Sequence, residues 1–151
     1  MTRQIEIIKK VRIFLLEGIK DLTTAQLNQI PAGFNNNIIW NLGHMIAAQQ
    51  GICYKRAGAR PVISDEFWEC YRTGSKPAGT VEAAEVEQIK SLFLSSIDQL
   101  AIDIDTTVFD NYTSWTTRYG VEIANIQDAI GFVPFHEGLH QGTILAMKKL
   151  V

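Results

Sequence analysis

The chain has 151 residues, of which 46% are hydrophobic and 20% charged, the composition of an ordinary globular protein with its own core. Its net charge is −2, and Lys and Arg do not cluster, which excludes the counterion-releasing surface that nucleic-acid binding requires. No apolar stretch approaches the roughly 20 residues that span a membrane, and charged residues interrupt the segment 1–22, which argues against a signal peptide. The two cysteines indicate free thiols, so we expect a single cytoplasmic domain over residues 1–151.

Four segments carry apolar side chains at the three- and four-residue spacing of amphipathic helices. The predicted helices span about residues 5–22, 37–58, 80–104 and 125–150. Asn37, Thr80 and Asn125 are expected N-caps, because their side-chain oxygens can accept a free backbone N–H of the first turn. Gly58 is expected to end the second helix, since glycine adopts the left-handed conformation found at helix C-termini.

The connection between the second and third helices is long enough to cross over the bundle, and a short helix is predicted around residues 65–71. Residues 105–122, rich in Thr, Tyr and Trp, are compatible with either a loop or a short β-hairpin. The predicted fold is therefore all-α, a four-helix bundle with a long crossover between helices 2 and 3. Pro134 lies inside the last helix, where it removes a backbone hydrogen bond to Ile130 and predicts a kink.

The three histidines of the chain, His44, His136 and His140, all occupy helical positions that are expected to face the interior. His136 and His140 are four residues apart, so their imidazoles lie on one face, about 6 Å apart along the axis, and can converge on one ion. His44 lies in the second helix on a face with Trp40, Asn41 and small residues, a pattern typical of a pocket wall. Because an unpaired buried imidazole costs stability, we predict that all three bind one metal ion.

Residues 136–140 read HEGLH, the pattern of a zinc-peptidase helix in which the glutamate activates water. The tail after His140 contains no further His, Asp, Glu or Cys, and Thr143 stands where the extended peptidase pattern requires glycine. A third ligand must therefore come from upstream, where His44 is the remaining histidine. We predict that the protein is not a peptidase, and that Glu137 lies on the surface or beside the ligands rather than acting as a base.

The segments NIIWNLGHM (37–45) and HEGLHQGTI (136–144) resemble those of the DinB-like, or YfiT-like, family of small bacterial four-helix-bundle proteins. The resemblance extends through chain length, helix order and the positions of both motifs. It implies one divalent ion per chain, most often zinc or nickel, held by His44, His136 and His140, and it implies a homodimer. Iron or copper would also suit nitrogen ligands. Some relatives transfer low-molecular-weight thiols such as bacillithiol or mycothiol, others are hydrolases or isomerases, and many have no known activity.

Three neutral imidazoles leave at least one coordination position open, which is typical of a catalytic metal site. We therefore predict a metal-dependent enzyme, a hydrolase or thiol S-transferase, in which water or a thiol cofactor attacks a small-molecule substrate. Glu137, Asn41 and Tyr54 are the candidates for a catalytic residue. The alternatives are a non-enzymatic protein that binds a metal or ligand, a stress-related helical dimer, and a purely structural helical dimer without an ion.

Small residues form a stripe on the last helix, roughly opposite the histidines: Gly131, Gly138, Gly142 and Ala146. Such a stripe allows another helix to approach closely. The neighbouring helix could belong to the same bundle or to a second copy across a two-fold axis, and the sequence leaves both alternatives open.

Overall fold

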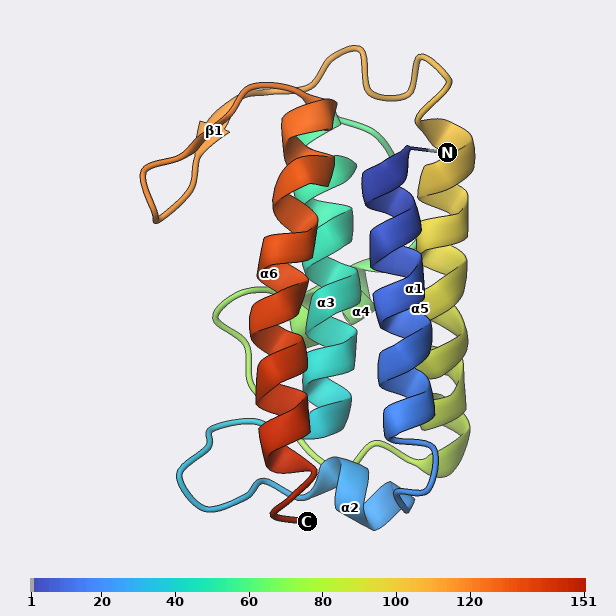
Figure 1. Ribbon diagram of the computed structural model, residues 1–151, viewed down its shortest axis with the longest axis vertical. Helices are drawn as coiled ribbons and strands as arrows, with labels where there is room; N and C mark the ends of the chain where they lie inside the picture. The colour runs from blue at the N-terminus through green and yellow to red at the C-terminus, as the bar shows by residue number, and fades with distance from the viewer. Residues whose placement is uncertain (1) are drawn as a thin grey trace.

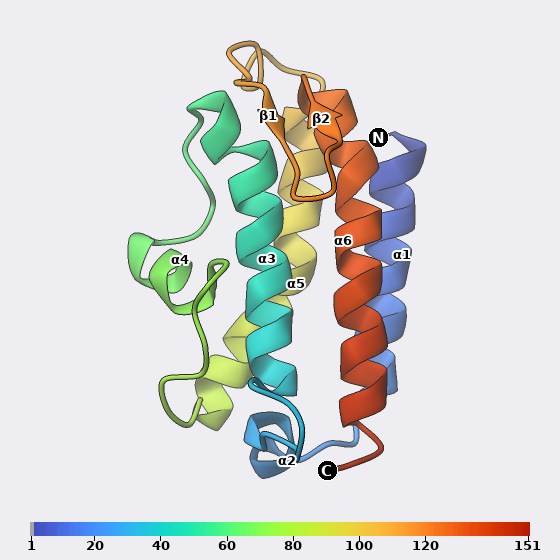
Figure 2. The same cartoon turned by 90° about the vertical axis from the view of Figure 1, so that its left-hand side faces the viewer.

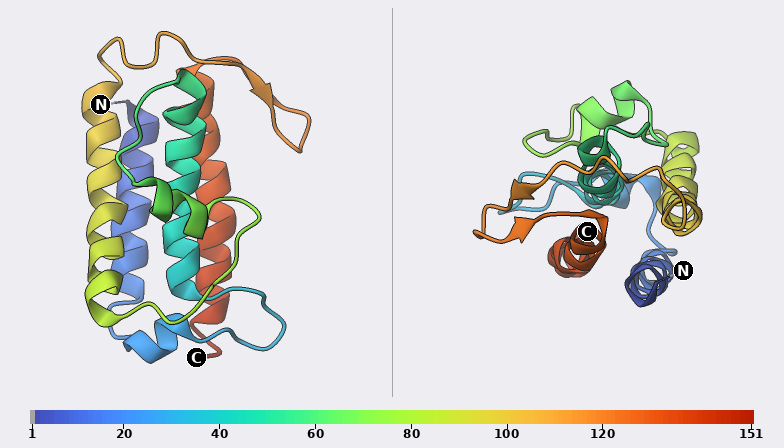
Figure 3. Two further views of the ribbon diagram at one scale, coloured as in Figure 1. Left: turned by 180° about the vertical axis from the view of Figure 1, so that it is seen from behind. Right: turned by 90° about the horizontal axis from the view of Figure 1, so that it is seen from above.

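The computed structural model describes residues 2–151, and its centre is a bundle of four long helices (Figure 1). These helices are α1 (Arg3–Gly18), α3 (Ile38–Cys53), α5 (Ala83–Asp103) and α6 (Ile126–Met147). Seen along the bundle axis (Figure 3), they follow one another in the order α1, α5, α3, α6, and each packs against its two neighbours. The predicted all-α four-helix bundle is confirmed.

The connection between α3 and α5 runs along the outside of the bundle because these two helices point in the same direction (Figure 1). It contains the 3-10 turn η1 (Lys55–Ala57) and the short helix α4 (Asp65–Tyr71), which packs on α3. Both the crossover and the short helix within it were predicted. Gly58 follows η1 with a φ of 66°, so it ends the 3-10 turn, while α3 itself already ends at Cys53.

The helix ends agree with the predicted caps in two places. The side-chain oxygen of Asn37 accepts from the backbone N–H of Trp40 at 2.9 Å, and that of Asn125 accepts from two N–H groups of the first turn of α6. The third predicted cap is wrong, because α5 begins at Ala83 with Glu82, not Thr80, as its N-cap.

The first predicted helix, about residues 5–22, ends earlier than expected, and the short helix that follows it was not predicted. α1 stops at Gly18, and a separate helix α2 (Thr24–Asn28) follows. The side chains and backbone N–H groups of Thr23 and Gln26 exchange hydrogen bonds, a capping box that starts the new helix. Ile19 and Leu22 keep the apolar spacing after Gly18, which is why spacing alone extended the predicted helix to residue 22.

Between α5 and α6 the chain forms a short β-hairpin, so the alternative of a plain loop is excluded. Its strands β1 (Trp115–Thr116) and β2 (Glu122–Ile123) are antiparallel, with Trp115 opposite Ile123. Gly120 lies in the connecting turn with a φ of 78°, a conformation that favours glycine. Figure 2 shows the hairpin extending from the top of the bundle beside α3 and α6.

The interior of the bundle contains two apolar clusters with a polar layer between them. One cluster includes Leu15, Met45, Phe93 and Ile144, and the other includes Ile5, Ile8, Ile97 and Val133. At the level between them, each of three helices contributes a buried polar side chain: Arg12 from α1, Ser96 from α5 and Glu137 from α6.

α6 continues through Pro134 as one unbroken helix. No helix among residues 2–151 combines the length and the apolar character needed to cross a membrane.

Candidate metal centre

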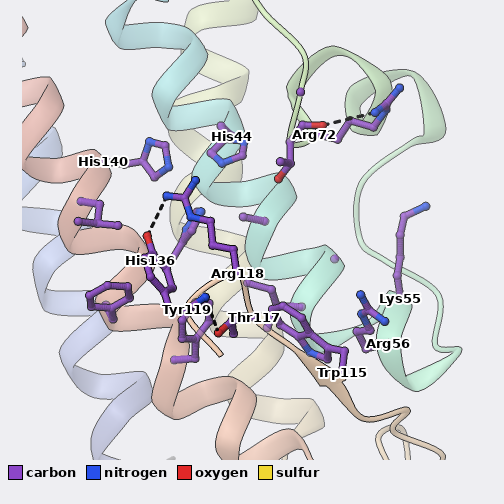
Figure 4. Close-up of a pocket in the computed structure, with 18 of the residues that line it drawn as sticks. His44, Lys55, Arg56, Arg72, Trp115, Thr117, Arg118, Tyr119, His136 and His140 are labelled. Carbon is purple, nitrogen blue, oxygen red and sulfur yellow. Dashed lines mark hydrogen bonds between the residues drawn. The ribbon is translucent and has the colours of Figure 1, made fainter. Parts of the chain in front are cut away.

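The three histidines come together where α3 and α6 pack against each other (Figure 4). One ring nitrogen from each of His44, His136 and His140 lies within 4.8 Å of the others. The ring centroids are 4.6 to 5.2 Å apart. His44 is buried and the other two are half-buried, so the cluster combines an interior position with access from one side.

His44 is held by α4 and by a neighbouring aromatic ring. Its Nδ1 lies 2.8 Å from the backbone carbonyl oxygen of Tyr71, which can only accept, so Nδ1 carries the proton and Nε2 is left for an ion. The ring also stacks on Trp40, with centroids 4.8 Å apart and planes inclined by 8°.

Two glycines of α3 allow α4 to come close enough for that hydrogen bond. A Cβ atom at Gly43 would lie 2.4 Å from the ring of Tyr71, and one at Gly51 would lie 2.7 Å from Trp68. The small residues of α3 were predicted to leave space beside the imidazole. In the structure, Ala48 and Gly51 line a pocket together with His44, and Trp68 of α4 lies against Gly51.

His140 is held by Asn41, the residue one turn before His44 on α3. The Oδ1 of Asn41 accepts from His140 Nδ1 at 2.8 Å, which again leaves Nε2 for an ion. The amide orientation of Asn41 follows from its Nδ2, which donates to Asn36 Oδ1 and to the carbonyl of Asn37. Asn41 was a catalytic candidate, and its position is that of a residue that orients a ligand.

The surroundings of the cluster favour neutral imidazoles. Burial, followed by the neighbouring histidines and the charge of Arg118, lowers the pKa of His136 to about 3. Burial is also the main cause that lowers the pKa of His140 to about 4, and it lowers the pKa of His44. Each ring therefore keeps a free nitrogen lone pair at neutral pH.

This donor set fits a divalent transition metal. Three nitrogens at 2.0–2.1 Å from a tetrahedral ion are about 3.4 Å apart, so the imidazoles need to move only slightly toward one another. Two of the three rings already have the tautomer that presents Nε2. The residues that would hold the ion are His44, His136 and His140.

Glu137 is neither on the surface nor beside the ligands, so that prediction was wrong. It is 1% exposed, and its Oε1 lies 2.6 Å from Nη2 of Arg12 on α1. Arg12 is fully buried and also donates to Ser96 Oγ at 3.0 Å. The carboxylate therefore belongs to the polar layer of the core, since Glu137 lies about 100° around α6 from His136.

Tyr54, the remaining catalytic candidate, is not brought to the histidines. Its hydroxyl donates to Asp103 Oδ2 at 2.7 Å, its ring packs against Phe109, and it does not line the pocket of the three histidines. Burial raises the pKa of this hydroxyl, which makes it a poor proton donor at neutral pH.

The histidines open into a pocket of about 810 Å³, and the face of α3 that was predicted to be a pocket wall lines it through Trp40, His44, Ala48 and Gly51. Its walls come from α3, η1, α4, the segment 72–74, the hairpin and α6. They include all three tryptophans of the chain, Trp40, Trp68 and Trp115, together with Phe132 and Phe135. The clustering of Trp and Tyr in the segment 112–119 was the sequence feature that could have indicated aromatic pocket walls. The sequence alone does not show that the hairpin brings this segment close to the histidines.

The comparisons with known proteins identify the family of the chain and agree with its fold. A search of the curated proteins found no match for the chain. The family model of the DinB superfamily matches residues 9–144, a range that includes all three histidines and nearly the whole bundle. The chain therefore belongs to the DinB superfamily.

Proposed function

We propose that the protein is a metal-dependent enzyme that acts on a small molecule, with one divalent ion bound by His44, His136 and His140. The observation that carries this proposal is the convergence of three neutral imidazoles on one side of a large pocket. Its volume of about 810 Å³ lies within the range of about 300–1,000 Å³ that is usual for small-molecule sites.

The proposed reaction is hydrolysis or the transfer of a low-molecular-weight thiol. When bound, an ion held by three neutral ligands supplies Lewis acidity that activates a water or thiol nucleophile near neutral pH. The residues of the chain would hold the ion, orient two of its ligands through Tyr71 and Asn41, and enclose the substrate between aromatic walls. Nitrogen ligands favour zinc or nickel here, and also suit iron or copper.

The test begins with metal content. Protein purified without a histidine tag should carry close to one transition-metal ion per chain by elemental analysis. His44→Ala should lower that content as much as His136→Ala, although the two positions lie on different helices. Gln141→Ala is the matched control, because Gln141 lies next to His140 on α6 but does not line the pocket. Full metal content in His44→Ala would exclude the three-histidine site.

The enzyme proposal then requires activity that depends on the ion. Thiol-transfer and ester-hydrolysis assays should show turnover by the metal-loaded protein, loss after chelation, and recovery when the ion is restored. Bound metal without turnover in either assay would favour a protein that binds a ligand at the ion instead.

A further inference from the structure

The pocket beside the histidines is lined by positive charge. Lys55 and Arg56 come from η1, Arg72 follows α4, and Arg118 comes from the hairpin. The chain has 16 acidic and 14 basic residues, yet no acidic residue is among those that line the pocket. This local charge is opposite in sign to the net charge of the protein, so it concentrates anions at the pocket.

Three of these cations are not neutralised by carboxylates. Arg72 pairs with Glu69 at 2.7 Å, but within residues 2–151 no carboxylate oxygen lies within 4.0 Å of Lys55, Arg56 or Arg118. A cation without a carboxylate partner beside a pocket retains its charge for a ligand, together with its remaining N–H donors.

Aromatic rings position these free cations. The Nζ of Lys55 lies 4.4 Å from the ring centroid of Trp68, and the guanidinium of Arg56 lies 4.9 Å from that of Trp115. Such stacking orders a cation without neutralising it. The rings also form walls of the same pocket, so apolar surface and positive charge lie next to each other in it.

Arg118 is the cation that acts on the histidines. Its guanidinium lies over Tyr119, donates to the Tyr119 hydroxyl at 2.8 Å, and extends toward the cluster in Figure 4. Arg118, His136 and His140 line the same pocket. A divalent ion on the histidines would add two further positive charges nearby, and an anionic group between them would relieve this repulsion.

We propose that the substrate is a small organic anion with a flat apolar body, whose charged group binds Arg118 beside the histidines. Its apolar part lies against the tryptophan and phenylalanine walls, and Lys55 and Arg56 attract it from the outer part of the pocket. The inference rests on the proposed function, because it describes the substrate of that site. The chemistry recognised is a carboxylate, sulfonate or phosphate on an aromatic or other flat frame.

The test compares two probes of nearly equal shape and different charge, 2-naphthoate and the neutral 2-naphthamide. Because all three tryptophans line the pocket, quenching of tryptophan fluorescence reports occupancy. The full chain is titrated as purified and again after chelation of metal. In both states we expect naphthoate to bind on the order of tenfold more tightly than naphthamide, with an affinity that falls as salt rises.

Variants then assign the preference to Arg118. Arg118→Gln should weaken naphthoate binding about fivefold and leave naphthamide binding unchanged, because one charge-assisted contact is lost. Arg60→Gln removes the same charge from a position outside the pocket lining and should change neither affinity. Equal affinities for the two probes, no saturable quenching by either, or equal effects of the two variants would overturn the inference.

The outcomes for the metal and for the anion are separable. If His44→Ala retains full metal content while the chelated protein still prefers naphthoate, the proposed metal site fails and the anion pocket stands. If metal content follows the three histidines but naphthoate has no advantage over naphthamide, the metal site stands and the anionic substrate class is wrong.

Discussion

The Oδ1 atom of Asn41 accepts a 2.8 Å hydrogen bond from Nδ1 of His140 and so joins α3 to a proposed metal ligand on α6. Loss of such a partner frees the ring to rotate and to change tautomer. We expect Asn41→Leu to lower metal affinity about tenfold, measured by competition with a chelator of known affinity. Asn41→Asp keeps an acceptor at the same place and should lose less. Unchanged affinity in the Leu variant would show that this hydrogen bond does not orient the ligand.

Gly43 allows a second test of how the proposed metal ligands are positioned, because its lack of a side chain lets α4 pack closely on α3. In Gly43→Ala the added methyl group would overlap the ring of Tyr71, at 2.4 Å, so α4 must shift and the carbonyl that holds His44 shifts with it. We expect weaker metal binding in the competition assay. Gly131→Ala is the control, because open space surrounds Gly131 and alanine there should stabilise the helix by up to about 1 kcal/mol. Equal metal affinities for the two variants would contradict the role of α4.

The ion pair of Arg12 and Glu137 predicts a large effect on stability rather than on chemistry. Glu137→Leu leaves a buried guanidinium unpaired and should lower the free energy of unfolding by about 3–5 kcal/mol, measured by urea denaturation. The double variant Arg12→Met with Glu137→Leu removes both charges and should recover much of that loss. If the losses in the free energy of unfolding caused by the two substitutions simply add in the double variant, the two side chains do not stabilise each other.

The same residue separates this protein from the peptidases whose pattern it shares. We expect no cleavage of a peptide library by the parent protein. Glu137→Gln should retain its metal, because the carboxylate faces Arg12 in the core rather than the histidines. Peptide cleavage that disappears in the Gln variant would reverse this conclusion.

The two cysteines should differ in reactivity. Cys53 is buried, and burial raises the pKa of its thiol to about 12, whereas Cys70 is exposed. Since the thiolate is the reactive form, we expect one thiol per folded chain to react rapidly with a thiol reagent at about pH 8, and both after denaturation. Cys70→Ser should abolish the rapid phase. Two thiols that react at equal rates in the native protein would contradict the burial of Cys53.

A homodimer remains our proposal for the state of assembly, with the outer face of α6 as the contact. Gly131, Gly138 and Gly142 are exposed, and apart from the neighbouring backbone of α6 itself no atom lies within 4 Å of a Cβ built at any of them, so packing inside the same bundle does not account for the stripe. Light scattering should give twice the chain mass of 16.9 kDa. Gly138→Leu should weaken the dimer, while Ser91→Leu, on the exposed side of α5, should not. A monomer mass at micromolar concentration would refute the proposal.

Helical spacing predicted the bundle and the meeting of the histidines, because it identifies the buried face of each helix. Helical spacing does not identify which buried side chains pair with each other. Ile8, Arg12 and Leu15 share a face, so the burial of Arg12 could have been inferred. Its ion-pair partner Glu137 could not, because it is 125 residues away in the sequence. The positive charge of the pocket could not be predicted from the sequence, for a different reason. Strands of two residues are too short to show alternation, and only the folded hairpin brings Arg118 to the histidines.

The polar layer between the two apolar clusters also limits how far α6 can slide along its neighbours. A slip of one helical turn, about 5.4 Å, would move Glu137 away from Arg12 and leave both charges buried against apolar side chains. The same slip would take His136, the residue adjacent to Glu137, out of level with His44. The ion pair does not line the pocket. It nevertheless fixes the position of α6 along the bundle axis, and this keeps the histidines of α6 level with the histidine of α3.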